Sequence, residues 1–226
     1  MNFDPTGGNG DRSSPAETDF ASARNRMVDR LEHNGRITRQ ETAGAMRAVP
    51  RHAFVPEDKA GSAYADRPLG IGEGQTISAP HMVAMMTDLL EVSRGDKVLE
   101  IGTGCGYHAA VTAELVGAEN VFSIEYHDSL AREAREVLEA CGYGAVTVQV
   151  ADGHDGWPTH APYRAAYLTC APTSFPEAVV EQVPDGVVVG PIGRTRQDLI
   201  RLRRRAGETI QRENHGGVRF VKMRRQ

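Results

Sequence analysis

The chain has 226 residues, of which 40% are hydrophobic and 25% charged, with a formal net charge of −4. This length and balance are typical of one α/β domain with a sizeable core. No apolar run approaches the ~18 residues of a transmembrane helix and no apolar signal-peptide core follows Met1, so we expect neither a membrane protein nor a secreted one.

The charges are unevenly distributed along the chain. Residues 194–226 carry 11 Lys and Arg against 3 Asp and Glu, whereas residues 1–193 carry 15 against 27. An acidic body argues against a nucleic-acid partner, because phosphate binding needs a basic surface. We interpret the basic C-terminal segment as a solvated arginine face, with an acidic partner as the alternative.

The first 50 residues are expected to contain helices and no strand. Residues 1–22, rich in Gly, Ser, Pro and Asp, are predicted to be a disordered leader. Amphipathic helices are predicted over residues 23–33 and 38–49. Thr38 is the expected N-cap of the second helix, and Glu41 would complete a capping box.

From residue 50 the chain is first irregular and then regular. Residues 50–78 leave no room for a long regular element, and such segments in compact domains are often functional. A helix with an apolar methionine-rich side is predicted over residues 80–91. Short apolar strands then alternate with helices, which predicts an α/β fold with a doubly wound, mostly parallel sheet. The strands are expected over residues 97–102, 121–125, 145–150, 165–169 and 186–193, and the helices over 107–116, 129–141 and 175–183.

The last part of the chain is expected to close the sheet. The sequences LIRLRRR (199–205) and VRFVKM (218–223) alternate apolar with basic residues, which predicts an antiparallel pair at the sheet edge. Arginine on an edge strand also discourages pairing between sheets of different molecules.

Three cysteines, Cys105, Cys141 and Cys170, form no CxxC pair, no zinc-ligand spacing and no disulfide framework. Their pattern fits a reducing compartment. The sequence therefore predicts a cytoplasmic protein without a metal site.

The strongest local motif is the glycine-rich sequence LEIGTGCGY (99–107), between a predicted strand and a predicted helix. Glycines let the backbone turn sharply and approach a ligand, and the helix N-terminus offers unpaired N–H groups. Glu125, at the end of the next strand, can accept hydrogen bonds from ribose hydroxyls. On the loop alone, a nicotinamide dinucleotide and S-adenosylmethionine (SAM) fit equally well.

Two further positions favour SAM over a dinucleotide. Glu100, at a strand end, is poorly placed beside a pyrophosphate but suits the ammonium group of a methionine. Asp152 and Gly153 directly follow the third strand, where an acceptor can meet an adenine amino group. Because ligands bind at the carboxyl edge of such sheets, Glu100, Glu125 and Asp152 together predict a SAM site.

Longer motifs resemble those of the protein-L-isoaspartate O-methyltransferases, over roughly residues 27–223. They are AMRAVPRHAFVP, AYADRPLGIGEGQTISAPH, VLEIGTGCGYHAAV, ADGHDGWPTHAPY and VRFVKM. The resemblance implies a Rossmann-like SAM-dependent fold and methylation of the free carboxylate of isoaspartyl residues in damaged proteins. The methyl ester then cyclises to a succinimide that reopens partly to normal aspartate, so the implied role is protein repair.

The resemblance also assigns site residues. It places Ser78 on the active-site serine, and it implies that Tyr126 lies against the adenine. Arg164 and the run from Thr169 to Pro172 depart from the family's pattern, which puts substrate geometry in question. The implied SAM contacts are Thr76, Glu100, Gly102, Gly104, Glu125, Tyr126, Asp152 and Gly153.

Ser78 has a physical reason to hold a carboxylate. With Pro80 in the first helical turn, Ser78 is the expected N-cap, and helix N-termini attract anions. An α-carboxyl has a pKa near ~3.5, so it is ionised at neutral pH and needs no general base. The alternative is that Ser78 is merely a cap, whose loss would cost ~1 kcal/mol.

Three other functions stay open on the sequence alone. They are a SAM-dependent enzyme with another carboxylate substrate, a non-catalytic binder of isoaspartyl proteins, and an NAD-dependent oxidoreductase. In each case we expect a monomer with one domain over residues 23–226. Its parts would be a helical and substrate-loop region (23–92), a cofactor-binding core (93–193) and edge strands (194–226).

Overall fold

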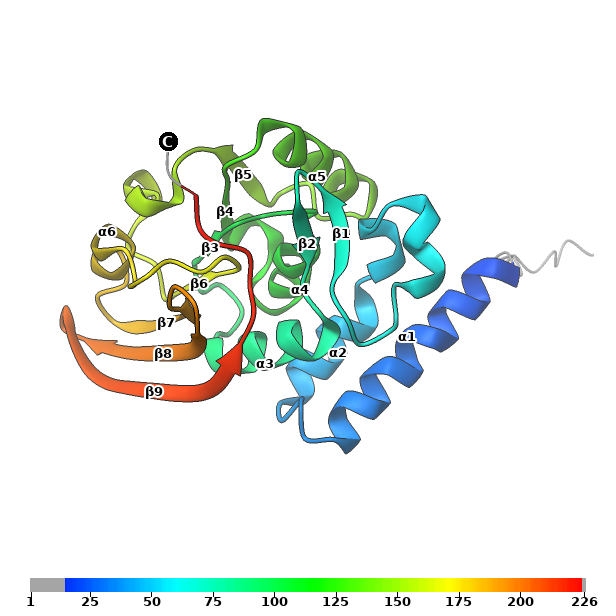
Figure 1. Cartoon of the computed structure of the whole chain (residues 1–226), viewed down its shortest axis with the longest axis horizontal. Helices are drawn as coiled ribbons and strands as arrows, with labels where there is room; N and C mark the ends of the chain where they lie inside the picture. Colours follow the sequence, from blue (N-terminus) through cyan, green and yellow to red (C-terminus); the bar gives the residue numbers. More distant parts are fainter. Residues whose placement is uncertain (1–14, 225–226) are drawn as a thin grey trace, which may run out of the picture.

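A central sheet organises the computed structural model, which describes residues 15–224. Within those residues, seven strands form one sheet in the order β5-β4-β3-β6-β7-β8-β9 (Figure 1). The strands are β3 (Val98–Ile101), β4 (Val121–Glu125), β5 (Thr147–Val150), β6 (Ala165–Leu168), β7 (Gly186–Ile192), β8 (Gln197–Arg205) and β9 (Glu208–Val218).

The strands β3 to β7 are parallel, as predicted. Strand β3 pairs with β4 on one side and with β6 on the other, so the direction of winding reverses between them. At such a switch point the connections leave toward opposite sides, and a crevice opens at the carboxyl ends of the strands. The predicted doubly wound sheet is therefore confirmed.

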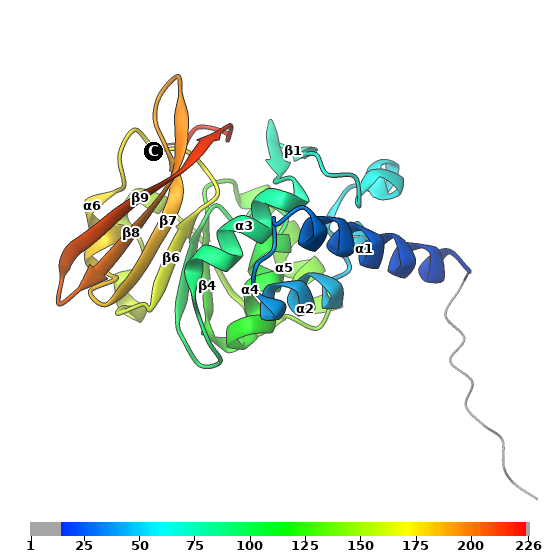
Figure 2. The same ribbon diagram turned by 90° about the horizontal axis from the view of Figure 1, so that it is seen from below.

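The helices cover the two faces of the sheet unequally (Figure 2). Three helices pack directly on one face, where the core includes strand residues such as Val98 and Tyr167, and two more pack over these helices. The short helix α6 packs on the other face against Leu99 and Ile101, through Val179. The helices are α1 (Pro15–His33), α2 (Gln40–Ala48), α3 (Pro80–Leu90), α4 (Tyr107–Val116), α5 (Asp128–Ala140) and α6 (Glu177–Glu181). No helix within residues 15–224 has the length and apolarity needed to cross a bilayer.

The first helix begins at Pro15, earlier than the predicted start at residue 23. Phe20 stacks on His52 with 4.2 Å between the ring centroids, and this contact anchors the early turns to a distant segment. Sequence periodicity contains no sign of such a contact. Residues 15–22 of the expected leader are thus helical, and residues 1–14 lie outside the described part of the chain.

The predicted capping of the second helix is wrong. The N-cap of α2 is Arg39, without a side-chain cap bond. Thr38 instead donates from its backbone N and its Oγ1 to Asp88 Oδ2, at 2.6 and 2.7 Å. A charged acceptor makes stronger hydrogen bonds than a neutral one, so the carboxylate of α3 takes both donors.

The irregular segment after Pro50 contains short turns and one small hairpin. Two 3₁₀ turns, η1 (Arg51–Phe54) and η2 (Glu57–Ser62), precede the antiparallel strands β1 (Leu69–Gly72) and β2 (Gln75–Ile77). The hairpin ends directly before α3, so it delivers the chain to the N-terminus of that helix.

The prediction that LIRLRRR pairs with VRFVKM at the sheet edge is wrong for VRFVKM. Strand β8 pairs antiparallel with β7 and with β9, but β9 is formed by residues 208–218 and not by VRFVKM. Ala206 and Gly207 have positive φ values of 51° and 80°, so the chain turns back immediately after β8. Residues 219–224 leave the sheet after β9.

Candidate active site

A partly open cavity lies at the carboxyl edge of β3 and β4. Its lining combines three parts of the chain that are distant in sequence: residues 75–78, the glycine loop after β3, and residues 221–224. Figure 1 shows the last of these as the segment that continues from β9 toward the ends of β3 and β6. The cavity therefore lies where the switch point predicts a ligand site.

The glycine loop is closely packed on its outer side. Gly102 has a φ of 99°, and a Cβ atom there would collide with Thr169 Oγ1. Thr169 Oγ1 donates to the carbonyl oxygen of Gly102 at 2.6 Å, which fixes the turn. Gly153 faces the same cavity, and a Cβ atom there would collide with the side chain of Ile101. At both positions a glycine is needed because a neighbouring side chain lies too close to the backbone for a Cβ atom.

Glu125 is held by three backbone donors at the end of β4. Its Oε2 accepts from the N–H of Gly104 at 2.8 Å, and its Oε1 accepts from the N–H groups of Tyr126 and His127 at 2.9 and 3.0 Å. These bonds link the glycine loop to the turn before α5. A carboxylate fixed in this place suits the hydroxyls of a ribose.

Glu100 is fully buried and lines the same cavity. It accepts from Ser123 Oγ at 2.5 Å and from Tyr167 Oη at 2.9 Å. Within residues 15–224 it forms no ion pair, and burial raises its pKa to about 8. Removing a carboxyl from water favours its neutral form until a cation arrives.

Ser78 lines the cavity opposite the glycine loop, between β2 and α3. The prediction that it caps α3 is wrong, because the N-cap is Ala79 and makes no side-chain cap bond. The carbonyl oxygen of Ser78 accepts from Arg51 Nη2 at 2.7 Å. Within the described residues, its hydroxyl makes no hydrogen bond and stays available to a ligand.

Asp66 occupies the N-terminus of α3. Its Oδ1 accepts from the backbone N of His81 at 2.9 Å and from His81 Nδ1 at 2.8 Å. Pro80 has no N–H, and the N–H of Met82 bonds to the Ala79 carbonyl at 2.9 Å. The first turn of α3 thus keeps no free N–H for a substrate, contrary to the expectation that it would help to hold a carboxylate.

Arg51 contacts both Ser78, before α3, and Tyr107, at the start of α4. Its side chain is fully buried and donates from Nε to the carbonyl of Ala63 at 2.8 Å, besides its bond to Ser78. The guanidinium lies 4.8 Å from the ring centroid of Tyr107, the first residue of α4 after the glycine loop. Burial lowers the pKa of Arg51 from its usual value, and Tyr107 opposes this shift.

The structure brings almost all of the predicted site residues to one cavity. The exception is Asp152, which lies outside the lining. Its Oδ1 accepts from the N and Nδ1 atoms of His154 at 2.9 and 2.8 Å, at the start of the turn η4 (Gly153–Asp155). The lining contains Thr76, Ser78, Glu100, Gly102, Gly104, Glu125, Tyr126 and Gly153.

The departures from the family's pattern fall in different places. Arg164 precedes β6, at the sheet edge opposite the cavity, and donates to the carbonyl of Asp185 at 3.2 Å. Thr169 and Cys170 line the cavity, as does Cys105. Burial raises the pKa of Cys105 to about 11 and that of Cys170 to about 12, so both remain thiols.

Some lining residues had no signal in the sequence. His108 lies on the cavity side of α4, where its Nε2 is 3.0 Å from Thr87 Oγ1, and burial lowers its pKa to about 3. The apolar residues around His108 predict a buried helix and give no sign of a cavity. Within residues 15–224 no cluster of three or more His, Cys, Asp or Glu could hold a metal ion.

Residues 22–226 match the model of the family described as protein-L-isoaspartate(D-aspartate) O-methyltransferase. Protein-L-isoaspartate O-methyltransferase 2 of Archaeoglobus fulgidus is 49% identical over 208 residues, covering 91% of this chain and 94% of that protein. Protein-L-isoaspartate O-methyltransferase of Methylorubrum extorquens is 45% identical over 216 residues, covering 95% and 93%.

Solved structures agree on the fold. A structure named protein-L-isoaspartate O-methyltransferase superposes with a TM-score of 0.79 at 26% identity, covering 88% of this chain and 65% of that one. A Plasmodium falciparum protein assigned to the same family, solved with S-adenosyl-L-homocysteine, superposes with a TM-score of 0.78 at 21% identity, covering 89% and 98%.

Proposed function

The chain belongs to the protein-L-isoaspartate(D-aspartate) O-methyltransferase family, and on that premise we propose how its cavity performs the reaction. The reaction is SAM-dependent transfer of a methyl group to the free carboxylate of L-isoaspartyl residues in damaged proteins. The observation that carries the proposal is that one cavity contains Ser78, Gly104 and Glu125. An acceptor held by Ser78 would therefore meet a donor held by the glycine loop.

SAM supplies the electrophile, a methyl group on a positively charged sulfur. Glu125 would accept from its ribose, and Glu100 would face its ammonium group. Glu100 supports this fit. Burying a carboxylate without a nearby cation costs free energy, and the ammonium group of SAM would provide that cation. Gly102 and Gly153 let the backbone of the cavity lining pack against Thr169 and Ile101, which a Cβ atom would prevent.

The substrate carboxylate needs orientation and no deprotonation. Its pKa near ~3.5 keeps it ionised, and one of its oxygens bonds to the methyl carbon as the carbon–sulfur bond breaks. No residue of the cavity has to take a proton, which agrees with a neutral His108 and protonated thiols. Positioning two reactants can contribute up to roughly 7–11 kcal/mol.

Ser78 is the proposed orienting donor. Because Asp66 fills the start of α3, the serine hydroxyl acts in place of the helix N-terminus that the sequence suggested. A single neutral hydrogen bond orients the carboxylate without neutralising it. This matters because the carboxylate loses its charge in the transition state, and strong stabilisation of the ground state would slow the step.

We also propose an oligomeric state and a cellular location for the enzyme. All of the groups named come from one chain, so a monomer suffices. The three cysteines are free, which supports the proposed cytoplasmic location.

The test is a paired methylation assay. Transfer from labelled SAM is measured to an isoaspartyl peptide and to its aspartyl twin, and only the first is expected to be labelled. Binding of SAM without any transfer to the isoaspartyl peptide would overturn the proposal.

Ser78→Ala tests the role of the hydroxyl. We expect kcat to fall about 10- to 100-fold while the Kd for SAM stays unchanged, because one orienting hydrogen bond is lost on the acceptor side. Ser93→Ala, an exposed serine after α3, is the control and should behave like the wild type.

A further inference from the structure

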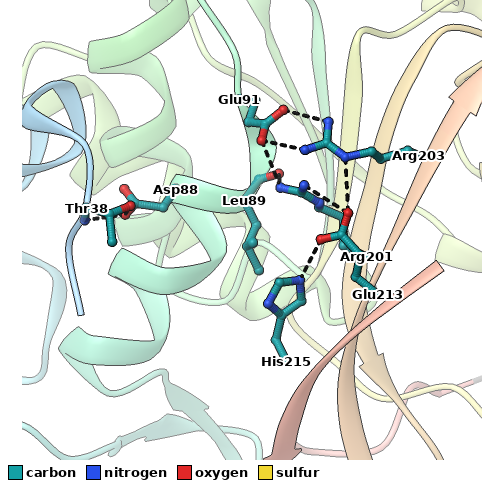
Figure 3. Close-up of polar contacts among 8 residues, drawn as sticks. All are labelled: Thr38, Asp88, Leu89, Glu91, Arg201, Arg203, Glu213 and His215. Atoms are coloured by element: carbon teal, nitrogen blue, oxygen red, sulfur yellow. Dashed lines mark hydrogen bonds and ion pairs between the residues drawn. The ribbon is translucent and has the colours of Figure 1, made fainter. Parts of the chain in front are cut away.

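The basic C-terminal segment divides into two parts with different partners. In the first part, Arg201 and Arg203 of β8 meet Glu91 at the end of α3 and Glu213 of β9 (Figure 3). The two hydrogen bonds from Arg203 to Glu91 are both 2.7 Å long. These charges neutralise one another inside the fold, so they offer little to an external partner.

The second part is the strap, which we define as residues 218–224. Gln197 of β8 holds it by accepting from the N–H of Phe220 at 2.6 Å and donating to the carbonyl of Phe220 at 3.1 Å. Ala171 holds it further along, through backbone bonds of 2.8 Å to Val221 and 3.0 Å to Met223. The strap is therefore an ordered segment that runs beside the end of β6.

The strap has an apolar side and a basic side. Val218, Phe220 and Met223 pack against the hydrophobic core. The remaining side chains of the strap, apart from Val221, are exposed and basic. They are Arg219, Lys222 and Arg224.

Two of these basic residues line the cavity. Within the described residues none of the three has an ion-pair partner, and Lys222 and Arg224 belong to the cavity lining. Two unpaired cations thus lie at the cavity in which donor and acceptor are proposed to meet.

The chemistry of methyl transfer limits what these cations can do. The acceptor carboxylate and the sulfonium lose their charges together, so a cation beside the reacting carboxylate would stabilise the ground state more than the transition state. A cation is useful here only to a group that keeps its charge during the reaction. A protein substrate brings such groups, because the residues that flank the isoaspartyl residue remain outside the cavity.

We propose that the outward face of the strap, through Lys222 and Arg224, binds acidic residues flanking the isoaspartyl residue and so selects acidic substrate segments. This inference rests on the proposed function. A short acidic segment fits better than a nucleic acid, because residues 1–193 carry 15 Lys and Arg against 27 Asp and Glu and would repel an extended polyanion.

The test uses three isoaspartyl peptides that differ only in whether Glu, Gln or Lys flanks the isoaspartyl residue on both sides. In the wild type at low salt we expect kcat/KM for the Glu peptide to exceed that for the Gln peptide about 3- to 10-fold, roughly the effect of two exposed charge pairs. The Lys peptide should be the poorest. Raising the salt should bring the three values together, since exposed charges are screened.

Paired variants assign the effect to the strap. The double variant Lys222→Gln/Arg224→Gln should lose the Glu-to-Gln preference, whereas Arg205→Gln/Arg212→Gln should keep it. The second pair removes the same charge from exposed positions of β8 and β9 outside the cavity lining. The preference is a ratio measured within each protein, so a general loss of activity cancels.

The outcomes separate the inference from the proposed function. Turnover of all three peptides with equal preference in wild type and strap variant overturns the inference alone. No turnover of any isoaspartyl peptide, with SAM bound, overturns the proposed function. Competitive inhibition by a single-stranded oligonucleotide that disappears in the strap variant, without a flank preference, would identify a nucleic-acid surface and overturn the inference.

Discussion

The two walls of the cavity are held in place differently. The cofactor wall, formed by the glycine loop and Glu125, consists of backbone turns at neighbouring strand ends, and its bonds join the loop directly to the next strand. The acceptor wall, formed by Ser78 and the strap, is held by contacts from remote segments, as with Arg51 on Ser78, Gln197 on Phe220 and the backbone of Ala171 on the strap. In the proposed function, the position of the donor would thus depend mainly on the geometry of neighbouring strand ends, and that of the acceptor on a few long-range contacts.

The largest expected effect comes from Gly102→Ala in the cofactor wall. A Cβ atom at this positive φ would collide with Thr169 Oγ1, so the loop must move. We expect the affinity for SAM to fall at least about 100-fold, since a φ of 99° is strained for alanine and the clash would also displace the Thr169 hydroxyl that bonds to the Gly102 carbonyl. Calorimetric titration with SAM measures this. Unchanged affinity in a folded variant would contradict the backbone-based account of this wall.

Arg51→Met should damage the acceptor wall more than the cofactor wall, because the hydrogen bond that it loses goes to Ser78. Loss of the bond to the Ser78 carbonyl lets the serine move, and a displacement of about 1 Å can reduce turnover ~100-fold. We expect kcat to fall by about that factor with the Kd for SAM within about threefold of the wild type.

Two further variants separate positioning from stability. Arg51→Lys, which can donate to one of the two carbonyls, should recover part of kcat. Arg47→Met removes ion pairs to Asp29 and Glu32 at a distance from the cavity and should leave kcat unchanged. A folded Arg51→Met protein with normal kcat would show that Arg51 does not position Ser78.

Glu100 should make SAM binding depend on pH. Its pKa of about 8 means that the empty enzyme is protonated there at neutral pH, and an ammonium must displace that proton. The affinity for SAM should rise about tenfold per pH unit toward pH ~8 and then level off. In Glu100→Gln, the plot of the logarithm of the SAM affinity against pH should have a slope that is smaller by about one, because binding no longer displaces the proton of Glu100. Equal slopes in the two proteins would exclude contact between Glu100 and the ammonium.

The same group predicts the sign of a stability change without cofactor. The pKa of Glu100 lies above its ordinary value of 4.5, so the folded state holds the proton more tightly than the unfolded chain does. The stability that this group contributes is complete at low pH and is lost as the pH rises through about 8. Glu100→Gln should therefore become the more stable protein in alkaline buffer, as judged by urea unfolding at pH 6 and pH 9.

The smallest effect is expected for Glu91→Gln, which belongs to neither wall. It weakens the bonds to Arg201 and Arg203, but Glu91 is 41% exposed, so the loss should be at most about 1 kcal/mol. The hydrogen bond from Arg203 lowers the pKa of Glu91. The stability that the Glu91 carboxylate contributes should therefore be lost as the pH falls below the ordinary pKa of a glutamate. Methylation rates should not change; a loss of activity would mean that the pairs on β8 also shape the cavity.

The cofactor wall was predictable because its signals are local. Gly102, Gly104 and Glu125 follow short apolar strands, and the carboxyl ends of parallel strands meet at one edge of a sheet. The elements between residues 80 and 205 were therefore placed nearly correctly. Asp152 fits this pattern as well, yet its oxygen bonds His154, which only the fold reveals.

The acceptor wall was predictable only in part. The motif around Ser78 predicted a serine at the cavity, where the structure places it, but the cap of α3 comes from Asp66, a residue in a loop without periodicity. The hairpin partner of β8 was missed for a related reason. VRFVKM alternates like a strand because one side of the strap packs on the core, and alternation does not distinguish a strand from an extended segment outside the sheet.

Asp66 has a consequence for how the enzyme behaves in a phosphate-rich solution. A bare helix start beside an acceptor pocket would attract any small oxyanion, and inorganic phosphate or sulfate would then compete with substrate. Here the protein's own carboxylate already occupies that position on His81, and its negative charge repels free anions. Free phosphate or sulfate should therefore find no binding position at the start of α3.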